Sequence, residues 1–193
     1  NAATANIALI AQNRMGGGPL DETANSASSG SVSVEDLSGL LDNRGTISGD
    51  LGLTVRAGRI ERTAGLRSGL DLSLSSTLGF TNTDGLTAAR DLYLSSSISL
   101  DNRALLGAGR DLYLSLGGGL TNSSTIFAFG DALIGADGGV ANQTNALILA
   151  QGNIRFRNAA GTGATGQLDN SSGRIQSLGG DIDIAASSVI NRR

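Results

Sequence analysis

The strongest constraint on the fold of this chain is a repeat of 20 residues. From Ile60 onward, four consecutive blocks of twenty match one another position by position. The first position of each block, and of the block that follows, is apolar: Ile60, Phe80, Leu100, Leu120 and Val140. Self-similarity at a fixed period of this length predicts a solenoid, in which each repeat packs on its neighbours.

Inside each block apolar and polar residues alternate, as in Leu70-Asp71-Leu72-Ser73-Leu74. This period of two is typical of a β-strand, and no stretch of the chain sustains the 3.6-residue period of a helix. Each block therefore holds short strands separated by turns rich in Gly, Asn, Asp and Ser. We expect an all-β fold, a parallel β-helix (solenoid) with rungs of about 20 residues.

The repeat extends beyond the four regular blocks, with small insertions. We predict one continuous solenoid over residues 41–193, with a loop excursion at 157–167, and irregular N-terminal rungs and a loop over residues 1–40. The excursion contains Gly161-Thr162-Gly163-Ala164-Thr165-Gly166, which satisfies the G-x-G-x-x-G pattern. A new repeat follows it instead of a helix, so we do not interpret it as a phosphate-binding loop.

Asparagine occupies the third position of the repeat at Asn82, Asn102, Asn122 and Asn142. We interpret these four residues as a structural turn ladder. Asparagine tolerates the positive φ that a corner often requires, and its amide can bond the next asparagine or the turn backbone. Asn122 and Asn142 also begin Asn-X-Ser/Thr triplets, but their place in the repeat favours the structural role over glycosylation.

Aspartate occupies the twelfth position at Asp71, Asp91, Asp111 and Asp131. Carboxylates stacked about 5 Å apart repel by about 1 kcal/mol per neighbouring pair in water. Three explanations remain open: Arg90 and Arg110 offset the charge, each Asp caps its own turn, or the column binds a cation. We predict no metal site, because no compact loop supplies the further oxygen ligands that Ca²⁺ needs.

Composition excludes several classes of function. The chain has no Cys and no His, and all 14 of its basic residues are Arg. The commonest general base and the commonest metal ligands are therefore missing, and the acidic residues follow the repeat instead of departing from it. We predict no catalytic residues and no cofactor. The net charge of −3 makes nucleic acid a poor partner, and no apolar run is long enough for membrane insertion.

Four aromatic residues project outward in the predicted rungs: Tyr93, Tyr113, Phe127 and Phe129. Aromatic residues on a stiff rod are suited to binding a receptor or a sugar, so they form a candidate binding face. The alternative is that Tyr93 and Tyr113 stack as a cross-strand pair, while Phe127 and Phe129 pack beneath an insertion near 143–147. Both interpretations stay open at this point.

The consensus of the repeat is L-x-N-x-x-x-(L/I)-x-A-x-x-D-L-x-L, and the match is most specific over residues 80–135. This consensus resembles the haemagglutinin repeat of filamentous haemagglutinin-like proteins. These are large exoproteins of two-partner secretion systems in Gram-negative bacteria, and they include contact-dependent growth inhibition toxins. The resemblance implies a right-handed β-helix that forms part of a long filament. It supplies no catalytic residues.

From this resemblance we expect a structural shaft segment of a secreted adhesin or contact-dependent growth inhibition exoprotein, located at the bacterial cell surface. Its implied partners are an outer-membrane transporter, contacted through other parts of the protein, and a host or target-cell receptor. The alternative is a receptor-binding segment of such an exoprotein, and an enzyme acting on polysaccharide is a distant third. Because the chain begins at Asn1 and not at Met, we expect it to be a fragment.

Overall fold

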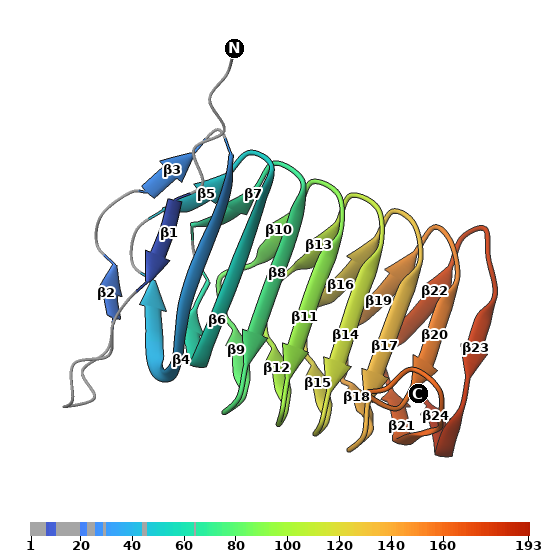
Figure 1. Cartoon of the computed structure of the whole chain (residues 1–193). Helices are drawn as coiled ribbons and strands as arrows, with labels where there is room; N and C mark the ends of the chain where they lie inside the picture. The colour runs from blue at the N-terminus through green and yellow to red at the C-terminus, as the bar shows by residue number, and fades with distance from the viewer. Residues whose placement is uncertain (1–6, 11–19, 23–25, 29, 44–45, 64) are drawn as a thin grey trace.

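The structure is a computed structural model in which residues 7–10, 20–22, 26–28, 30–43, 46–63 and 65–193 are described. These residues form 24 β-strands and no helix. Strands about 20 residues apart pair in parallel, which builds a parallel β-solenoid of about eight turns (Figure 1). The predicted all-β parallel solenoid and its rung length are confirmed. No helix among the described residues has the length and apolarity to cross a membrane.

The strands line up as three faces of the solenoid (Figure 1). The first face contains β8 (Asp71–Ser76), β11 (Leu92–Ser96), β14 (Leu112–Leu116), β17 (Ala132–Ala136), β20 (Ile154–Arg157) and β23 (Ile182–Ile184). The second contains β9 (Phe80–Asn82), β12 (Leu100–Asn102), β15 (Leu120–Asn122), β18 (Val140–Asn142), β21 (Thr165–Ser171) and β24 (Ala186–Arg192). The third contains β3 (Ser26–Ser28), β5 (Ile47–Gly49), β7 (Leu66–Ser68), β10 (Leu86–Ala88), β13 (Leu106–Ala108), β16 (Thr125–Ala128), β19 (Leu147–Ala150) and β22 (Arg174–Ser177).

Two long strands near the N-terminus join the first face to the second. They are β4 (Ser31–Asn43) and β6 (Gly52–Arg62), which pair with each other with register shifts after Asp36 and after Leu41. The strands β1 (Ile7–Ile10) and β2 (Leu20–Glu22) pair with β4. Parallel pairing therefore begins before residue 41, while residues 1–6, 11–19, 23–25 and 29 of the predicted irregular region 1–40 lie outside the described part of the chain.

The register places equivalent apolar residues of successive rungs directly over one another. Leu92 pairs with Leu72 on one side and with Leu112 on the other, and all three are fully buried. The inward positions of the three faces together form one continuous hydrophobic core. This arrangement explains why the repeat is regular: a single rung buries too few leucines to offset the conformational entropy of its twenty residues.

The predicted excursion at 157–167 is divided by the structure. Residues 158–164 form a loop between β20 and β21, whereas Thr165 already begins β21 and is buried. The loop is closed internally, because Asn158 Oδ1 accepts the backbone N–H groups of Thr162 (3.0 Å) and Gly163 (2.9 Å). It is thus a compact turn and not an open segment.

The final turn leaves its inward-facing residues uncovered. Ile182, Ile184 and Val189 continue columns that are buried in the central rungs, yet they are between 39% and 54% exposed. A residue of the core is therefore held by two neighbouring rungs in the middle of the solenoid and by one at this end.

This difference generates a prediction about stability. Leu112→Ala in a central rung is expected to lower the free energy of unfolding by about 2–5 kcal/mol, because it leaves a cavity between two rungs. Ile184→Ala, the matched control in the final turn, is expected to cost about 1 kcal/mol or less, because its side chain is partly in water already. Urea denaturation followed by circular dichroism measures both. Equal losses would contradict the stacked core.

Candidate functional site

The four predicted ladder asparagines form a continuous column inside the solenoid. Each lies at the end of its strand and is at most 1% exposed. The side-chain Nδ2 of each donates to Oδ1 of the asparagine in the next rung, at 2.7, 2.8 and 2.8 Å, and Asn142 continues the column to Asn170 at 2.7 Å. The same amides also reach the turn backbone, as Asn82 Nδ2 does with the carbonyl oxygen of Leu105 (3.2 Å).

The backbone explanation offered for these asparagines is wrong. None of the four adopts a positive φ; among the described residues other than glycine, only Asn145 and Ser172 do. The asparagines are extended because they end strands, and the corner is formed by the residues that follow. What the position requires is an amide, which donates and accepts at once and so satisfies the buried polar atoms of two rungs.

Sequence reasoning missed how the column passes through the rung before Asn82. In the rung that starts at Ile60, Arg62 stands where asparagine is expected, and the neighbouring Thr63 takes over its role. The Oγ1 hydroxyl of Thr63 is buried and donates to Asn82 Oδ1 at 3.1 Å. A hydroxyl one residue after a repeat position carries no distinctive signal in the sequence, because the substitution depends on the register shift in β6.

The ladder predicts a strong effect of removing one amide donor. Asn102→Asp keeps the shape of the side chain but places a carboxylate oxygen against Asn122 Oδ1 in a buried site. We expect the free energy of unfolding at pH 7 to fall by about 3 kcal/mol, because buried charges without partners are more costly than neutral groups. Asn191→Asp, in the exposed final turn, is the control and should change little. Urea titration distinguishes the two variants, and equal effects would rule out the ladder as a buried network.

The aspartate column is organised by backbone hydrogen bonds between rungs. Oδ1 of each aspartate accepts the backbone N–H of the equivalent residue in the next rung; the four donors are Asp91 (3.2 Å), Asp111 (3.2 Å), Asp131 (2.8 Å) and Asn153 (2.7 Å). Each carboxylate therefore caps the following rung, and the interpretation that it caps its own turn is wrong. The described residues contain no group of three or more His, Cys, Asp or Glu side chains placed to hold a metal ion.

Arginine neutralises part of this column from the next rung. Arg90 Nε donates to Asp71 Oδ1 at 2.7 Å, and Arg110 Nε donates to Asp91 Oδ1 at 2.8 Å, each with a second bond from Nη2 to the other carboxylate oxygen. Each arginine thus pairs with the aspartate of the preceding rung. Such bidentate pairs are stronger than single charged contacts.

The surroundings of Asp91 and Asp71 lower the pKa of both carboxyl groups. Burial by itself raises the pKa of Asp91, whose side chain is only 2% exposed, but hydrogen bonds from Arg110 and from the Asp111 backbone outweigh it. For Asp71 the hydrogen bond from Arg90 is the main cause of the lowered pKa, and burial opposes it. Both carboxylates are therefore stabilised in the charged form by the fold.

The lowered pKa values predict acid sensitivity with a definite sign. A carboxyl group with a pKa that is lower in the folded chain stabilises the fold above its unfolded pKa of about 3.9. That stabilisation is lost as the pH falls through the folded value. Unfolding free energies measured in urea from pH 7 to pH 2.5 should therefore decline below about pH 4. The decline should be shallower in Arg110→Gln, and identical pH profiles would count against the pairing.

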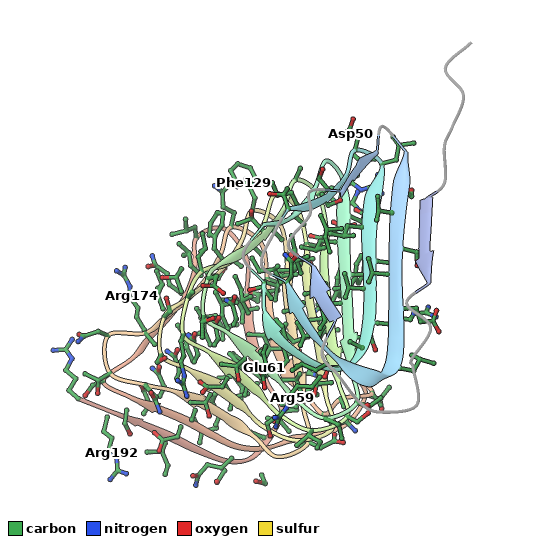
Figure 2. All side chains as sticks on the ribbon, turned by 90° about the vertical axis from the view of Figure 1, so that its left-hand side faces the viewer. Asp50, Arg59, Glu61, Phe129, Arg174 and Arg192 are labelled. Carbon is green, nitrogen blue, oxygen red and sulfur yellow. The ribbon has the colours of Figure 1, made fainter. Side chains whose placement is uncertain are left out.

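The four outward aromatic residues fall into two pairs on different faces. Tyr93 and Tyr113 lie on the first face, with ring centroids 4.9 Å apart and an interplanar angle of 5°. Phe127 lies on the third face, in β16. Phe129, which is labelled in Figure 2, directly follows this strand and is 57% exposed. The two pairs do not form one binding face. More than half of Phe129 is open to solvent, and its packing beneath residues 143–147 stays a prediction.

One groove in the described part of the chain was not anticipated from the sequence. It encloses about 600 Å³ where the first face meets the second, and its lining includes exposed Leu78 and Ile98. Arg59 and Glu61, which are labelled in Figure 2, also line the groove, and Arg59 Nη1 lies 3.4 Å from Glu61 Oε1. The groove combines apolar and already paired polar groups, and brings no set of acids or bases to a common point.

Comparisons with protein-family models, with curated proteins and with solved structures give no match. These comparisons therefore assign no family to the chain. The geometry establishes a parallel β-solenoid with a buried asparagine ladder and a partly exposed aspartate ladder.

Proposed function

We propose that this chain is a structural shaft segment of a large secreted bacterial adhesin or contact-dependent growth inhibition exoprotein. One observation carries the proposal: every described rung from β6 to β24 pairs in parallel with the next, so the solenoid is continuous along its axis (Figure 1). A rod built this way gains length by adding rungs, and each rung needs only its neighbours. That property suits a spacer which carries a distal adhesive or toxic segment away from the cell.

The wider context follows from the repeat consensus. We propose that the segment is exported by an outer-membrane transporter of a two-partner secretion system and resides at the surface of a Gram-negative bacterium. The absence of cysteine supports an export route in which an unfolded chain is threaded outward, because no disulfide forms prematurely. Each rung then templates the next as the chain emerges.

We also propose that the segment is not an enzyme. The support comes from the sequence, which lacks His, Lys and Cys, the residues that most often act as bases and nucleophiles. The regular aspartates support the same view, because their carboxylates are engaged in bonds between rungs, and those of Asp71 and Asp91 are held charged by them. Departures from a repeat, and not its consensus residues, are where function is expected.

The shaft proposal predicts tolerance of a change in length. Deleting one whole repeat, residues 100–119, joins Ser99 to Leu120 and lets β11 stack on β17 in the same register. The variant is expected to unfold cooperatively and to be shorter by about 4.8 Å in small-angle X-ray scattering. In the full exoprotein, attachment to target cells should persist.

The matched control removes half a repeat, residues 100–109. This deletion brings unlike faces together and should prevent cooperative folding, because inward and outward positions no longer align. If the deletion of the whole repeat also failed to fold, or folded and abolished attachment, the shaft proposal would be wrong.

A second candidate is a receptor-binding segment, favoured by the exposure of Phe129 beside Phe127 on the third face. Exposed aromatic side chains of this kind are common anchors in interfaces. The double variant Phe127→Ala/Phe129→Ala separates the two functions in a cell-binding assay. Unchanged binding supports the shaft, whereas loss of binding by a correctly folded variant supports the receptor-binding segment.

A further inference from the structure

The stack of tyrosines on the first face ends abruptly at Ser73. The outward column in which Tyr93 and Tyr113 stand continues in register to Ser73 and then to Thr54. On the other side of the pair, Leu133 follows Tyr113, and the loop 158–164 is fastened nearby because Ser115 Oγ donates to the carbonyl oxygen of Ala159 at 3.0 Å. The Tyr113 end of the stack is therefore followed by Leu133 and the loop, whereas the Tyr93 end is followed by the short side chain of Ser73.

The consequence is that the face of the Tyr93 ring on the Ser73 side has no aromatic ring of the column against it. Tyr93 is 40% exposed, while Tyr113 is more buried. The two rings are 4.9 Å apart, so a further ring stacked on Tyr93 would lie one rung along, directly over Ser73. A serine side chain ends at Oγ and is too short to fill that place itself, and parallel stacking at this distance is a favourable aromatic geometry.

Polar side chains lie close in sequence to Ser73 and Tyr93, and hydrogen bonds between them fix their orientation. Arg90 and Asp71 form a bidentate pair at the start of the same two strands, and Asp71 Oδ1 also accepts the Asp91 backbone N–H. The hydroxyl groups of Ser73 and Ser75 belong to β8 and are partly exposed. The pair keeps unused guanidinium N–H donors and carboxylate lone pairs, so it can both donate to and accept from a ligand.

We propose that the open face of Tyr93 binds a neutral hexopyranose unit of a glycan. A pyranose has an apolar C–H face that packs on an aromatic ring, and its hydroxyl groups bond to Arg90, Asp71 and the β8 serines. Because Arg90 is already neutralised by Asp71, the site does not favour an anion. The proposal goes beyond the shaft function and does not depend on it.

The composition of the chain makes the site directly observable. Tyr93 and Tyr113 are the only tyrosines among the 193 residues. Incorporation of 3-fluorotyrosine therefore gives two ¹⁹F resonances, which Tyr113→Phe assigns. The probes are the methyl glycosides of β-galactose, β-glucose, α-mannose and N-acetyl-β-glucosamine, with adenosine as a planar aromatic comparison. A ligand of about a dozen heavy atoms is expected to bind with a Kd on the order of 1 mM.

The expected result is a saturable shift of the Tyr93 resonance with at least one glycoside and a smaller change at Tyr113. Ser73→Tyr places a third ring in the open position and should abolish the shift. Asp71→Asn should weaken binding several-fold while preserving the fold, because Asn153 already plays the equivalent capping role by accepting the Asp181 N–H at 2.9 Å. Thr121→Ala, on the second face, is the control and should bind as the parent does.

Three outcomes would overturn the proposal. These are no saturable shift with any glycoside, a shift with adenosine alone, or undiminished binding in both Ser73→Tyr and Asp71→Asn. Circular dichroism establishes that each variant is folded. None of these results bears on the shaft, which is tested separately by deletion of a repeat.

Discussion

Parallel backbone pairing between successive rungs is the interaction on which the rest of the structure depends. It fixes equivalent residues about 4.8 Å apart along the axis, so each side chain has its own counterpart as its nearest neighbour. The repeat therefore selects side chains that interact well with copies of themselves. Leucine does so through dispersion and burial, asparagine through an amide that donates upward and accepts from below, and tyrosine through ring stacking.

Aspartate differs from these residues, because two copies of it one rung apart do not attract each other. Like charges one rung apart repel, yet Asp71 and Asp91 are kept charged because each accepts a backbone N–H and an arginine from the following rung. The arginine gives way to glycine at Gly130 and again at Gly152. Asp131 follows the first glycine, whereas Asn153, a neutral amide that still accepts the N–H of Asp181, follows the second. The column thus conserves the hydrogen bond and changes the charge.

A fold made of equivalent rungs supplies a scaffold but no site, and function has to come from residues that break the equivalence. In this chain the breaks are local: the tyrosine stack that stops at Ser73, the exposed Phe129, and the compact loop at 158–164. Each leaves the buried columns intact. The core therefore tolerates variation on the outer surface, so one solenoid can present different surfaces along its length.

The sequence by itself determined the solenoid, its rung length and most members of each column, because a period of 20 residues with alternating polarity buries its apolar residues only when equivalent residues stack on one another. The sequence also identified the ladder asparagines, but it did not reveal that their backbone is extended. An asparagine that bonds its counterpart in the next rung and an asparagine that forms a corner would recur at the same position of the repeat. Only the tertiary structure decided which partners the polar residues choose. That Arg90 reaches back to Asp71, that Thr63 replaces an asparagine, and that the tyrosines and phenylalanines lie on different faces all depend on where the chain turns. Turn geometry is set by contacts between rungs, and those contacts exist only once neighbouring rungs are in place.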